Sequence, residues 1–447
     1  MRVRKPVRAA VVALVAATST LGNSAAATTV VPPDYEVLAP VETGPPVDTQ
    51  LLDRRIDKTW NAAGLGSNKA LAVDAFSSSP ALEADRSADT PLMPASTTKL
   101  LTATAVLETL GPEKRFRTTV VRKGQQITLV GGGDPQLTTF PTTNAVNADA
   151  SLVRLARLTA AALRKAGVDS VRLGYDESLF SPPQKQPFWG DDFLAIGVVA
   201  PISALSADGG RLYPPASTRS PTPALTATQS FERLLQARGV QVVGKVTATA
   251  AAGDEIAAVE SAPLSDLVEH LLLTSDNTEA EILAHQVGLE VLDDPTFAGG
   301  ARATLKVLND LGVDTAGVVL NDGSGLARSN RISPQTLISV LRTAIEVDPD
   351  RLWPVYTGLP VAGFDGSLTS RFAAPAARAG RGAVSGKTGT LTGTSALAGL
   401  ASDRDGQLLL YAVMTNDVSV FASSPAIDRV LARIAGCRCA AEESASP

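Results

Sequence analysis

Ser96 and Lys99, three residues apart, are the first residues in the chain whose types and spacing suit catalysis. They open the segment Ala95–Leu110, which has the apolar spacing of a helix and ends before Gly111-Pro112. Residues three apart share a helix face, so the lysine amine can reach the serine hydroxyl. A serine needs a base to become a nucleophile, and a lysine can serve once burial lowers its pKa. Alone, the pair is a weak signal, because a solvated lysine beside a helical serine is the simpler interpretation.

A polar triplet, Ser275-Asp276-Asn277, separates two apolar helical segments. Polar groups between core helices need partners. One interpretation is structural: Asp276 or Asn277 caps the helix expected from Thr278. The functional alternative has Ser275 relaying a proton and Asn277 binding a substrate amide.

A third motif, Lys387-Thr388-Gly389-Thr390, lies on a strand expected over Ala383–Thr390. Gly386 and Gly389 flank the lysine and predict close approach of a substrate backbone. A phosphate-binding loop is the rival interpretation. It needs a glycine five residues before Gly386, where Arg381 stands, and it needs a following helix.

The elements that position these motifs predict an α+β fold, with strands near both ends of the chain and helices between them. We expect an antiparallel sheet with helices as the catalytic domain, interrupted by a smaller α/β insertion. The expected boundaries are a signal peptide at 1–27, catalytic parts at 28–115 and 263–438, the insertion at 116–262 and a tail at 439–447. Expected helices are Leu51–Ala62, Ser151–Ala166, Gln229–Ala237, Leu264–Leu273, Thr278–Leu292, Arg302–Gly312 and Pro334–Ile345; expected strands are Lys69–Phe76, Leu82–Ser87, Phe116–Val121, Gln126–Val130, Val171–Tyr175, a strand around Val240–Thr249, Ser395–Ala401 and Gln407–Met414.

Composition excludes several classes of protein. Of 447 residues, 44% are hydrophobic and 19% are charged, which argues against a disordered or collagen-like chain. The net charge of −5 argues against a nucleic-acid binder. With only His270 and His285, the chain has little room for a His-rich metal site or a Ser-His-Asp triad. We therefore expect neither a metal nor a cofactor.

The N-terminus predicts export. Met1–Ala27 combines a basic start, a short apolar run and Ala25-Ala26-Ala27, as signal peptides do. The run is shorter than the ~20 residues of a membrane span, although an uncleaved anchor stays an alternative. After cleavage the protein would lie outside the cytoplasmic membrane. The only cysteines, Cys437 and Cys439, would form a local disulfide there or belong to a loose tail.

Together, and in this order, the three motifs resemble those of DacB-type D-alanyl-D-alanine carboxypeptidases, which are low-molecular-mass penicillin-binding proteins. Further segments match the same family between Trp60 and Met414: Gly132–Pro135, Pro201–Leu205, Asn321–Leu326 with Asn330-Arg331, and Phe364–Leu368. The resemblance implies that Ser96 attacks the penultimate D-Ala and that Lys99 is its base. It also implies a proton relay through Ser275 with Lys387 beside it, an oxyanion hole at the N–H groups of Ser96 and Thr390, and carboxylate binding by the hydroxyls of Thr388 and Thr390.

The resemblance further implies that four residues contact the stem-peptide side chain: Trp189, Asp192, Ser324 and Arg328. The expected partners are peptidoglycan stem peptides ending in D-Ala-D-Ala and, as covalent inhibitors, β-lactams; a peripheral membrane association stays open. Two other functions stay open: a β-lactamase of the same superfamily and a non-catalytic wall-binding protein. The Glu-x-x-Leu-Asn element of active-serine β-lactamases is missing, because Leu305 and Gly317 stand where its glutamate would be.

Overall fold

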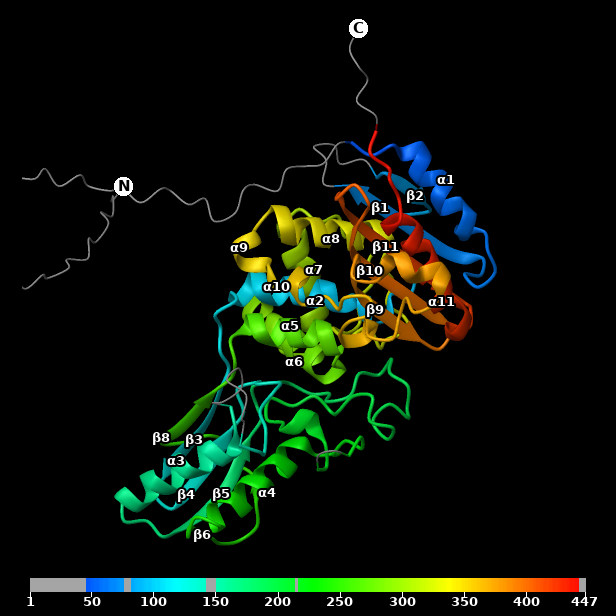
Figure 1. Cartoon of the computed structure of the whole chain (residues 1–447). Coiled ribbons are helices and arrows are strands. Elements are labelled where there is room, and N and C mark those ends of the chain that lie inside the picture. The colour runs from blue at the N-terminus through cyan, green and yellow to red at the C-terminus, as the bar shows by residue number, and fades with distance from the viewer. Residues whose placement is uncertain (1–45, 76–81, 142–149, 214–215, 442–447) are drawn as a thin grey trace, which may run out of the picture. The chain divides into compact units, whose positions relative to one another are not determined.

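A computed structural model describes residues 46–75, 82–141, 150–213 and 216–441, all within one compact unit. The expected signal peptide, residues 1–27, lies outside these ranges. The described chain forms two sheets, each with its own helices (Figure 1). The fold is α+β, as the sequence predicts.

The first sheet has five antiparallel strands in the order β2-β1-β11-β10-β9, so strands from both ends of the chain meet in it. In register, Asn68 of β1 pairs with Asn416 of β11. The strands are β1 (Asn68–Ala75), β2 (Ala84–Arg86), β9 (Val384–Leu391), β10 (Thr394–Ser402) and β11 (Leu408–Asn416).

Both faces of the first sheet are covered, which explains why β11 is apolar almost throughout. Successive side chains on a strand point to opposite faces. Leu410, Ala412 and Met414 belong to the apolar core shared with α2, α5, α6 and α8, whereas Leu409, Tyr411 and Val413 belong to the core shared with α1 and α11. Figure 1 shows where these helices lie around the sheet. The helices of this part are α1 (Thr49–Trp60), η1 (Ala95–Thr97), α2 (Thr98–Leu110), α5 (Leu264–Thr274), α6 (Asn277–Leu292), α7 (Phe297–Asp310), α8 (Pro334–Glu346), α9 (Pro349–Leu352), α10 (Pro354–Thr357), η3 (Gly366–Leu368), η4 (Pro375–Gly380) and α11 (Val420–Ala435).

The second sheet is built between residues 117 and 260, inside the range expected for the insertion. Its order is β6-β5-β4-β3-β8, with β7 also beside β5, and it has a core of its own that includes Ile127, Leu173 and Phe231. Its elements are β3 (Arg117–Lys123), β4 (Gln126–Val130), α3 (Leu152–Lys165), β5 (Ser170–Asp176), η2 (Asp208–Gly210), α4 (Pro223–Gln236), β6 (Gln241–Val242), β7 (Thr247–Ala248) and β8 (Asp254–Glu260).

Some elements differ from the sequence predictions. The strand expected around Val240–Thr249 is two short strands, β6 and β7, with Gly244 at a φ of 82° between them. Helix α4 begins six residues before Gln229, with Pro223 in its first turn. Strand β8 and helix α11 were not predicted, the helix because Ser423, Ser424 and Pro425 resemble a loop. The turn expected between the first two strands falls on residues 76–81, outside the described ranges.

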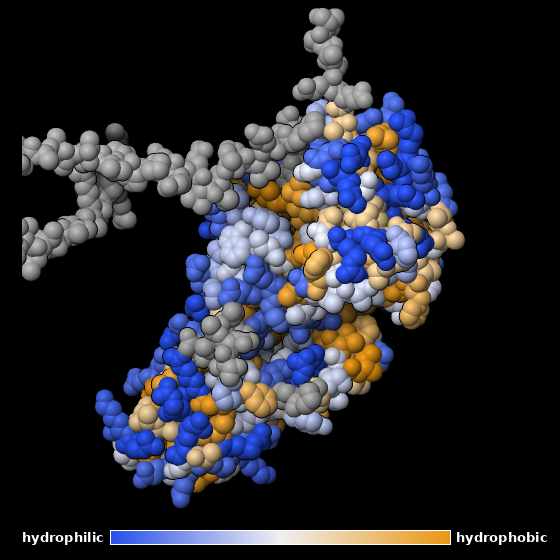
Figure 2. Space-filling view, viewed as in Figure 1, coloured by the Kyte–Doolittle hydropathy of each residue, from blue (hydrophilic) through white to orange (hydrophobic). Residues whose placement is uncertain are grey.

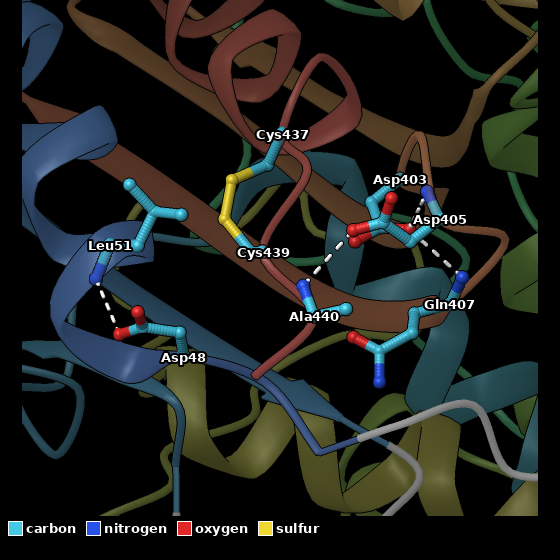
Figure 3. Close-up of a disulfide and its surroundings, with 8 residues drawn as sticks. All are labelled: Asp48, Leu51, Asp403, Asp405, Gln407, Cys437, Cys439 and Ala440. Atoms are coloured by element: carbon cyan, nitrogen blue, oxygen red, sulfur yellow. Dashed lines mark hydrogen bonds between the residues drawn. A yellow bond between two sulfur atoms is a disulfide. The ribbon is translucent and has the colours of Figure 1, made fainter. Parts of the chain in front are cut away.

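The two cysteines form a disulfide, and both are fully buried (Figure 3). The strand-like segment that carries them is joined to the segment before α1: the N–H of Asp48 donates to the carbonyl of Cys439 at 2.7 Å, and the N–H of Ala441 donates to the carbonyl of Pro46 at 2.7 Å. Of the two alternatives from sequence, the local disulfide is therefore the one in the structure, and the segment through Ala441 is docked.

Hydrophilic residues cover much of the face shown in Figure 2, with apolar residues in separate groups between them. The most exposed large apolar side chains, Phe421, Phe364 and Tyr213, come from three separate segments of the chain, one in α11 and two in loops. Among the described helices, none is both long and apolar enough to cross a membrane.

Candidate active site

Ser96 and Lys99 lie where η1 runs into α2. Ser96 is half-buried in η1, and Lys99 is fully buried in the first turn of α2. The Lys99 ammonium donates to the Ser96 hydroxyl oxygen at 2.9 Å. Ala95, just before the serine, has a φ of 48°, a left-handed conformation that is costly for alanine and common at functional sites. The contact between Ser96 and Lys99 that their spacing predicts is therefore present in the structure.

Three oxygen atoms surround Nζ of Lys99: Ser96 Oγ at 2.9 Å, Asn277 Oδ1 at 2.7 Å and the Ser324 carbonyl at 2.8 Å. A neutral amine has two hydrogens and one lone pair. Because Asn277 Oδ1 and the Ser324 carbonyl have no hydrogen to donate, they take the two hydrogens of the neutral amine. The lone pair is then left for the hydroxyl hydrogen of Ser96, which is the geometry of a general base.

Burial lowers the pKa of Lys99 to about 8, and the charges of Glu281, Asp322 and Asp276 oppose this by raising it. At pH 7, one unit below this pKa, about a tenth of this lysine is uncharged. Among the described residues, no carboxylate forms a direct ion pair with it. A lysine in solution, with a pKa near 10.4, offers far less free base.

The Ser275-Asp276-Asn277 triplet joins α5 to α6, and the structural interpretation of it is confirmed. Asp276 caps α6 by accepting from the N–H of Glu279 at 3.0 Å. Asn277 uses both ends of its amide: Oδ1 accepts from Lys99, and Nδ2 donates to the carbonyl of Val198 at 3.0 Å. In this structure Asn277 therefore positions the lysine, and its contact with a substrate amide stays a prediction.

Ser275 ends α5 in the left-handed conformation, with a φ of 62°. That conformation is strained for serine, and here it accompanies a contact with the strand side of the site. Nζ of Lys387, on β9, donates to Ser275 Oγ at 2.8 Å and to the carbonyl of Thr388 at 3.0 Å. Burial, and next the charge of Lys99, hold the pKa of Lys387 well below its ordinary value.

Strand β9 lies directly against the helix start that carries the serine. A Cβ on Gly389 would be 2.4 Å from the carbonyl oxygen of Pro94, so only glycine permits this packing. A Cβ on Gly386 would be 2.3 Å from the Tyr411 hydroxyl. The sequence suggested that these glycines make room for a substrate; in the structure their near neighbours are the protein's own atoms. Contact of Gly389 with a substrate stays a prediction.

Two threonines of β9 lie beside this packing contact. Thr388 is half-buried, and its hydroxyl donates to the Ser367 hydroxyl oxygen at 2.8 Å. Thr390 is exposed. Ser367 belongs to η3, so a helix turn that the sequence motifs did not assign to the site supplies a hydroxyl at its edge.

The residues expected at the stem-peptide side chain occupy unlike places. Trp189 is buried against Phe297, and its indole N–H donates to Asp322. Ser324 is fully buried and offers Lys99 its carbonyl rather than its hydroxyl. The other two, Asp192 and Arg328, are exposed, and Arg328 donates to the Thr392 carbonyl at 3.0 Å.

The sequence analysis missed two buried carboxylates, Glu281 and Asp322, that hold the loop bearing Ser324. Glu281 stands four residues after Asn277, a spacing that places both on one face of α6 and could have indicated it. The histidines take other roles: His285 is buried between Phe180 and Phe297, and the half-exposed His270 pairs with Glu279 at 2.8 Å. No cluster of three or more metal-ligating side chains occurs within the described ranges.

Comparison with known proteins identifies the class. The chain matches the D-Ala-D-Ala carboxypeptidase 3 (S13) family over residues 52–221 and 213–435. It is 35% identical to Carboxypeptidase Rv3627c of Mycobacterium tuberculosis, covering 78% of this chain and 77% of the relative, and 36% identical to Carboxypeptidase DacB of Mycolicibacterium smegmatis, covering 80% and 78%. Its fold is similar to that of penicillin binding protein 4 (dacB) from Haemophilus influenzae, with a TM-score of 0.70, 22% identity, and coverage of 87% and 98%.

The protein is thus a carboxypeptidase enzyme of mixed α+β fold with a half-buried serine hydrogen-bonded to a buried lysine. It belongs to the D-Ala-D-Ala carboxypeptidase 3 (S13) family.

Proposed function

We propose that this enzyme removes the terminal D-Ala from peptidoglycan stem peptides through an acyl-enzyme on Ser96. The contact that carries the proposal is the 2.9 Å hydrogen bond between Ser96 Oγ and a buried Lys99 whose pKa is lowered to about 8. The relative from Actinomadura, 29% identical, is named a D-alanyl-D-alanine carboxypeptidase and supports the choice of substrate.

In the acylation step, neutral Lys99 takes the hydroxyl proton as Ser96 Oγ bonds to the carbonyl carbon of the penultimate D-Ala. The backbone N–H groups of Ser96 and Thr390 stabilise the resulting oxyanion. The hydroxyls of Thr388 and Thr390 bind the terminal carboxylate. Their half-buried and exposed positions on β9, beside η1, support this role.

The leaving D-Ala needs a proton on its nitrogen as the peptide bond breaks. Ser275 donates it and takes back a proton from Lys99, which had received the Ser96 proton and so becomes neutral again. Lys387, 2.8 Å from Ser275 Oγ, supplies the hydrogen-bonding environment of that relay. Water then attacks the acyl-enzyme with Lys99 again as base. The stem peptide is released, and the Ser96 hydroxyl is restored.

The same nucleophile can cleave a cross-link when the leaving group is a larger amine. We propose carboxypeptidase action as the main activity and endopeptidase action on cross-links as the second. β-Lactams would acylate Ser96, and the resulting acyl-enzyme would be hydrolysed slowly. The exposed Asp192 and Arg328 remain the proposed contacts for the stem-peptide side chain.

The site of action would be outside the cytoplasmic membrane, after cleavage near Ala27. The basic, apolar and small-residue pattern of the leader supports this, as does the Cys437–Cys439 disulfide, because disulfides persist in oxidising compartments. Peripheral association with the membrane remains part of the proposal.

The test is the intact mass of wild type and Ser96→Ala after incubation with a penicillin, followed by an assay of D-Ala release from a pentapeptide. We expect one adduct on wild type, none on the variant, and D-Ala release by wild type alone. An adduct on Ser96→Ala would overturn the assignment of the nucleophile. Absence of an adduct on folded wild type would favour a non-catalytic wall-binding protein.

A further inference from the structure

Helix α6 places two residues on the face that meets α2. Asn277 contacts Lys99 directly, and Glu281, one turn later, lies beneath the loop that supplies the other oxygen acceptor. Glu281 is fully buried. Glu281 has no role in the proposed mechanism. Burying an ionisable carboxyl group costs free energy unless the group is hydrogen-bonded.

Both oxygens of Glu281 accept backbone N–H groups of the loop. Oε1 accepts from the N–H of Ser324 at 2.7 Å, and Oε2 accepts from the N–H of Gly323 at 3.1 Å. The carbonyl of Ser324, in the next peptide unit, accepts from Lys99 at 2.8 Å. One peptide segment thus connects the carboxylate to the base.

The loop is held from the α2 side as well. The Thr102 hydroxyl donates to the carbonyl of Gly323 at 2.7 Å. A Cβ on Gly323 would be 2.5 Å from the Cβ of Ala284, and a Cβ on Gly325 would be 1.9 Å from the carbonyl oxygen of Ala95. The loop therefore lies tightly between α6 and the start of α2, where a side chain would displace it.

Asp322 fixes the adjoining residues. It accepts four hydrogen bonds of 2.6–3.0 Å, from the Trp189 indole, the N–H groups of Gly325 and Ala327, and the Asn330 amide. The Gly325 N–H and the Ser324 carbonyl belong to one peptide unit, so Asp322 holds the unit that carries the carbonyl, and Glu281 holds the two peptide units before it.

We infer that Glu281 is a positioning residue for the Lys99 base: by holding the Gly323 and Ser324 amides, it fixes the segment that leads into the Ser324 carbonyl and, together with Asp322, keeps that carbonyl at Nζ. This rests on the proposed function. With that carbonyl and the Asn277 oxygen each taking one hydrogen, the lone pair of the neutral amine is directed at Ser96. Without the carboxylate, the segment before the carbonyl loses two hydrogen bonds, the carbonyl can shift from Nζ, and the amine can turn away from the hydroxyl.

Charge gives the inference a signature that folding alone would not produce. Lys99 is affected by Glu281 of α6, by Asp322 of the loop and by Asp276 at the cap of α6; Lys387 of β9 also lies near. Burial and the charge of Asp322 raise the pKa of Glu281 to about 8, so it charges in the range in which Lys99 loses its proton. Removing this acid therefore lowers the pKa of Lys99.

The experiment is Glu281→Gln, measured as the rate constant of acylation by a penicillin between pH 5.5 and 10. Glutamine retains one acceptor oxygen but turns an NH₂ group toward the other backbone N–H. We expect the plateau rate to fall roughly tenfold, because the base is misplaced. The acidic limb of the profile is the range in which the acylation rate rises with pH. We expect this limb to shift to lower pH by about half to one unit.

The matched control is Glu279→Gln, on the same helix and nearly buried, whose carboxylate instead contacts His270 and Gln136. We expect its rate to stay within about threefold of wild type, with the limb unmoved. Should Glu281→Gln fail to fold, Thr102→Val removes the hold on Gly323 without changing charge. It should lower the plateau severalfold and leave the limb in place.

The outcomes separate the two proposals. Unlabelled wild type would refute the proposed acyl-enzyme itself. Labelled wild type together with a Glu281→Gln profile of unchanged plateau and limb would overturn only the positioning role. A Thr102→Val plateau equal to wild type would overturn it in the same way.

Discussion

The helix side and the strand side of the site each bury one lysine, but in different surroundings. Lys99 faces three oxygen acceptors, and the charges of Glu281 and Asp322 counteract burial, so its pKa lies at about 8. Lys387 has the Ser275 hydroxyl and one carbonyl, and the charge of Lys99 lowers its pKa further. The difference teaches that burial alone does not make a base. We expect Lys99 to titrate in the working range as the base and Lys387 to serve as a hydrogen-bond donor to Ser275.

The largest expected effect comes from Lys99→Ala. Without the amine, the Ser96 hydroxyl has no proton acceptor, and we expect penicillin acylation to slow by about 10⁴-fold. Stopped-flow or mass measurements of acylation provide the rate, and circular dichroism checks the fold. A loss of less than tenfold in the acylation rate would contradict the assignment of Lys99, rather than Lys387, as the base.

Lys387→Ala should cost less, about 10²-fold in acylation, because it removes one relay contact and leaves the base in place. Because burial and the charge of Lys99 hold the pKa of Lys387 well below that of an ordinary lysine, we expect the acidic limb of the profile to stay where it is in wild type. A limb that moves upward or downward by a full unit would show that Lys387 carries charge in the working range.

The pH profile of wild type sharpens the comparison. Lys99 acts in its neutral form, so the acylation rate should rise with pH and level off above about 8, following its lowered pKa. Below that point, each pH unit should cost about tenfold. A profile flat from pH 6 to 9 would contradict a base with this pKa.

The smallest effect is expected where the two sides touch. Gly389→Ala would bring a Cβ against the Pro94 carbonyl and push β9 from η1, destabilising the fold by about 1–3 kcal/mol and slowing acylation severalfold. Gly393→Ala, at a φ of 81° with nothing within 4 Å, tests backbone strain alone and should leave acylation unchanged. Thermal unfolding and acylation rates measure both. Equal results for the two variants would contradict the packing argument.

Local patterns allowed much of this molecule to be predicted from the sequence. The spacing of Ser96 and Lys99 specifies their contact, because both lie within one helical turn. Strand β4, Gln126–Val130, falls where its apolar pattern places it. The α+β class likewise follows from the order of helical and extended segments.

The features of the site that could not be predicted from the sequence are contacts between segments far apart in the chain. The Ser324 carbonyl reaches Lys99 across 225 residues, and backbone groups have no signature in a sequence. Trp189 was expected near substrate, yet its indole finds a buried partner, Asp322, 133 residues away. Gly389 was predicted to make room for a substrate backbone, because nothing in the sequence shows that Pro94 would be its neighbour.

The hydrogen bond between Pro46 and Ala441 makes the described chain nearly a closed ring. With its ends so close, the fold depends less on where the chain begins and ends than on which segments are neighbours in space. A peptide bridge from Ala441 to Pro46 would keep β1 beside β11, and the chain could open instead at the exposed turn around Gly124, between β3 and β4. A circular permutant cut there would keep the first sheet and the serine–lysine pair on uninterrupted chain.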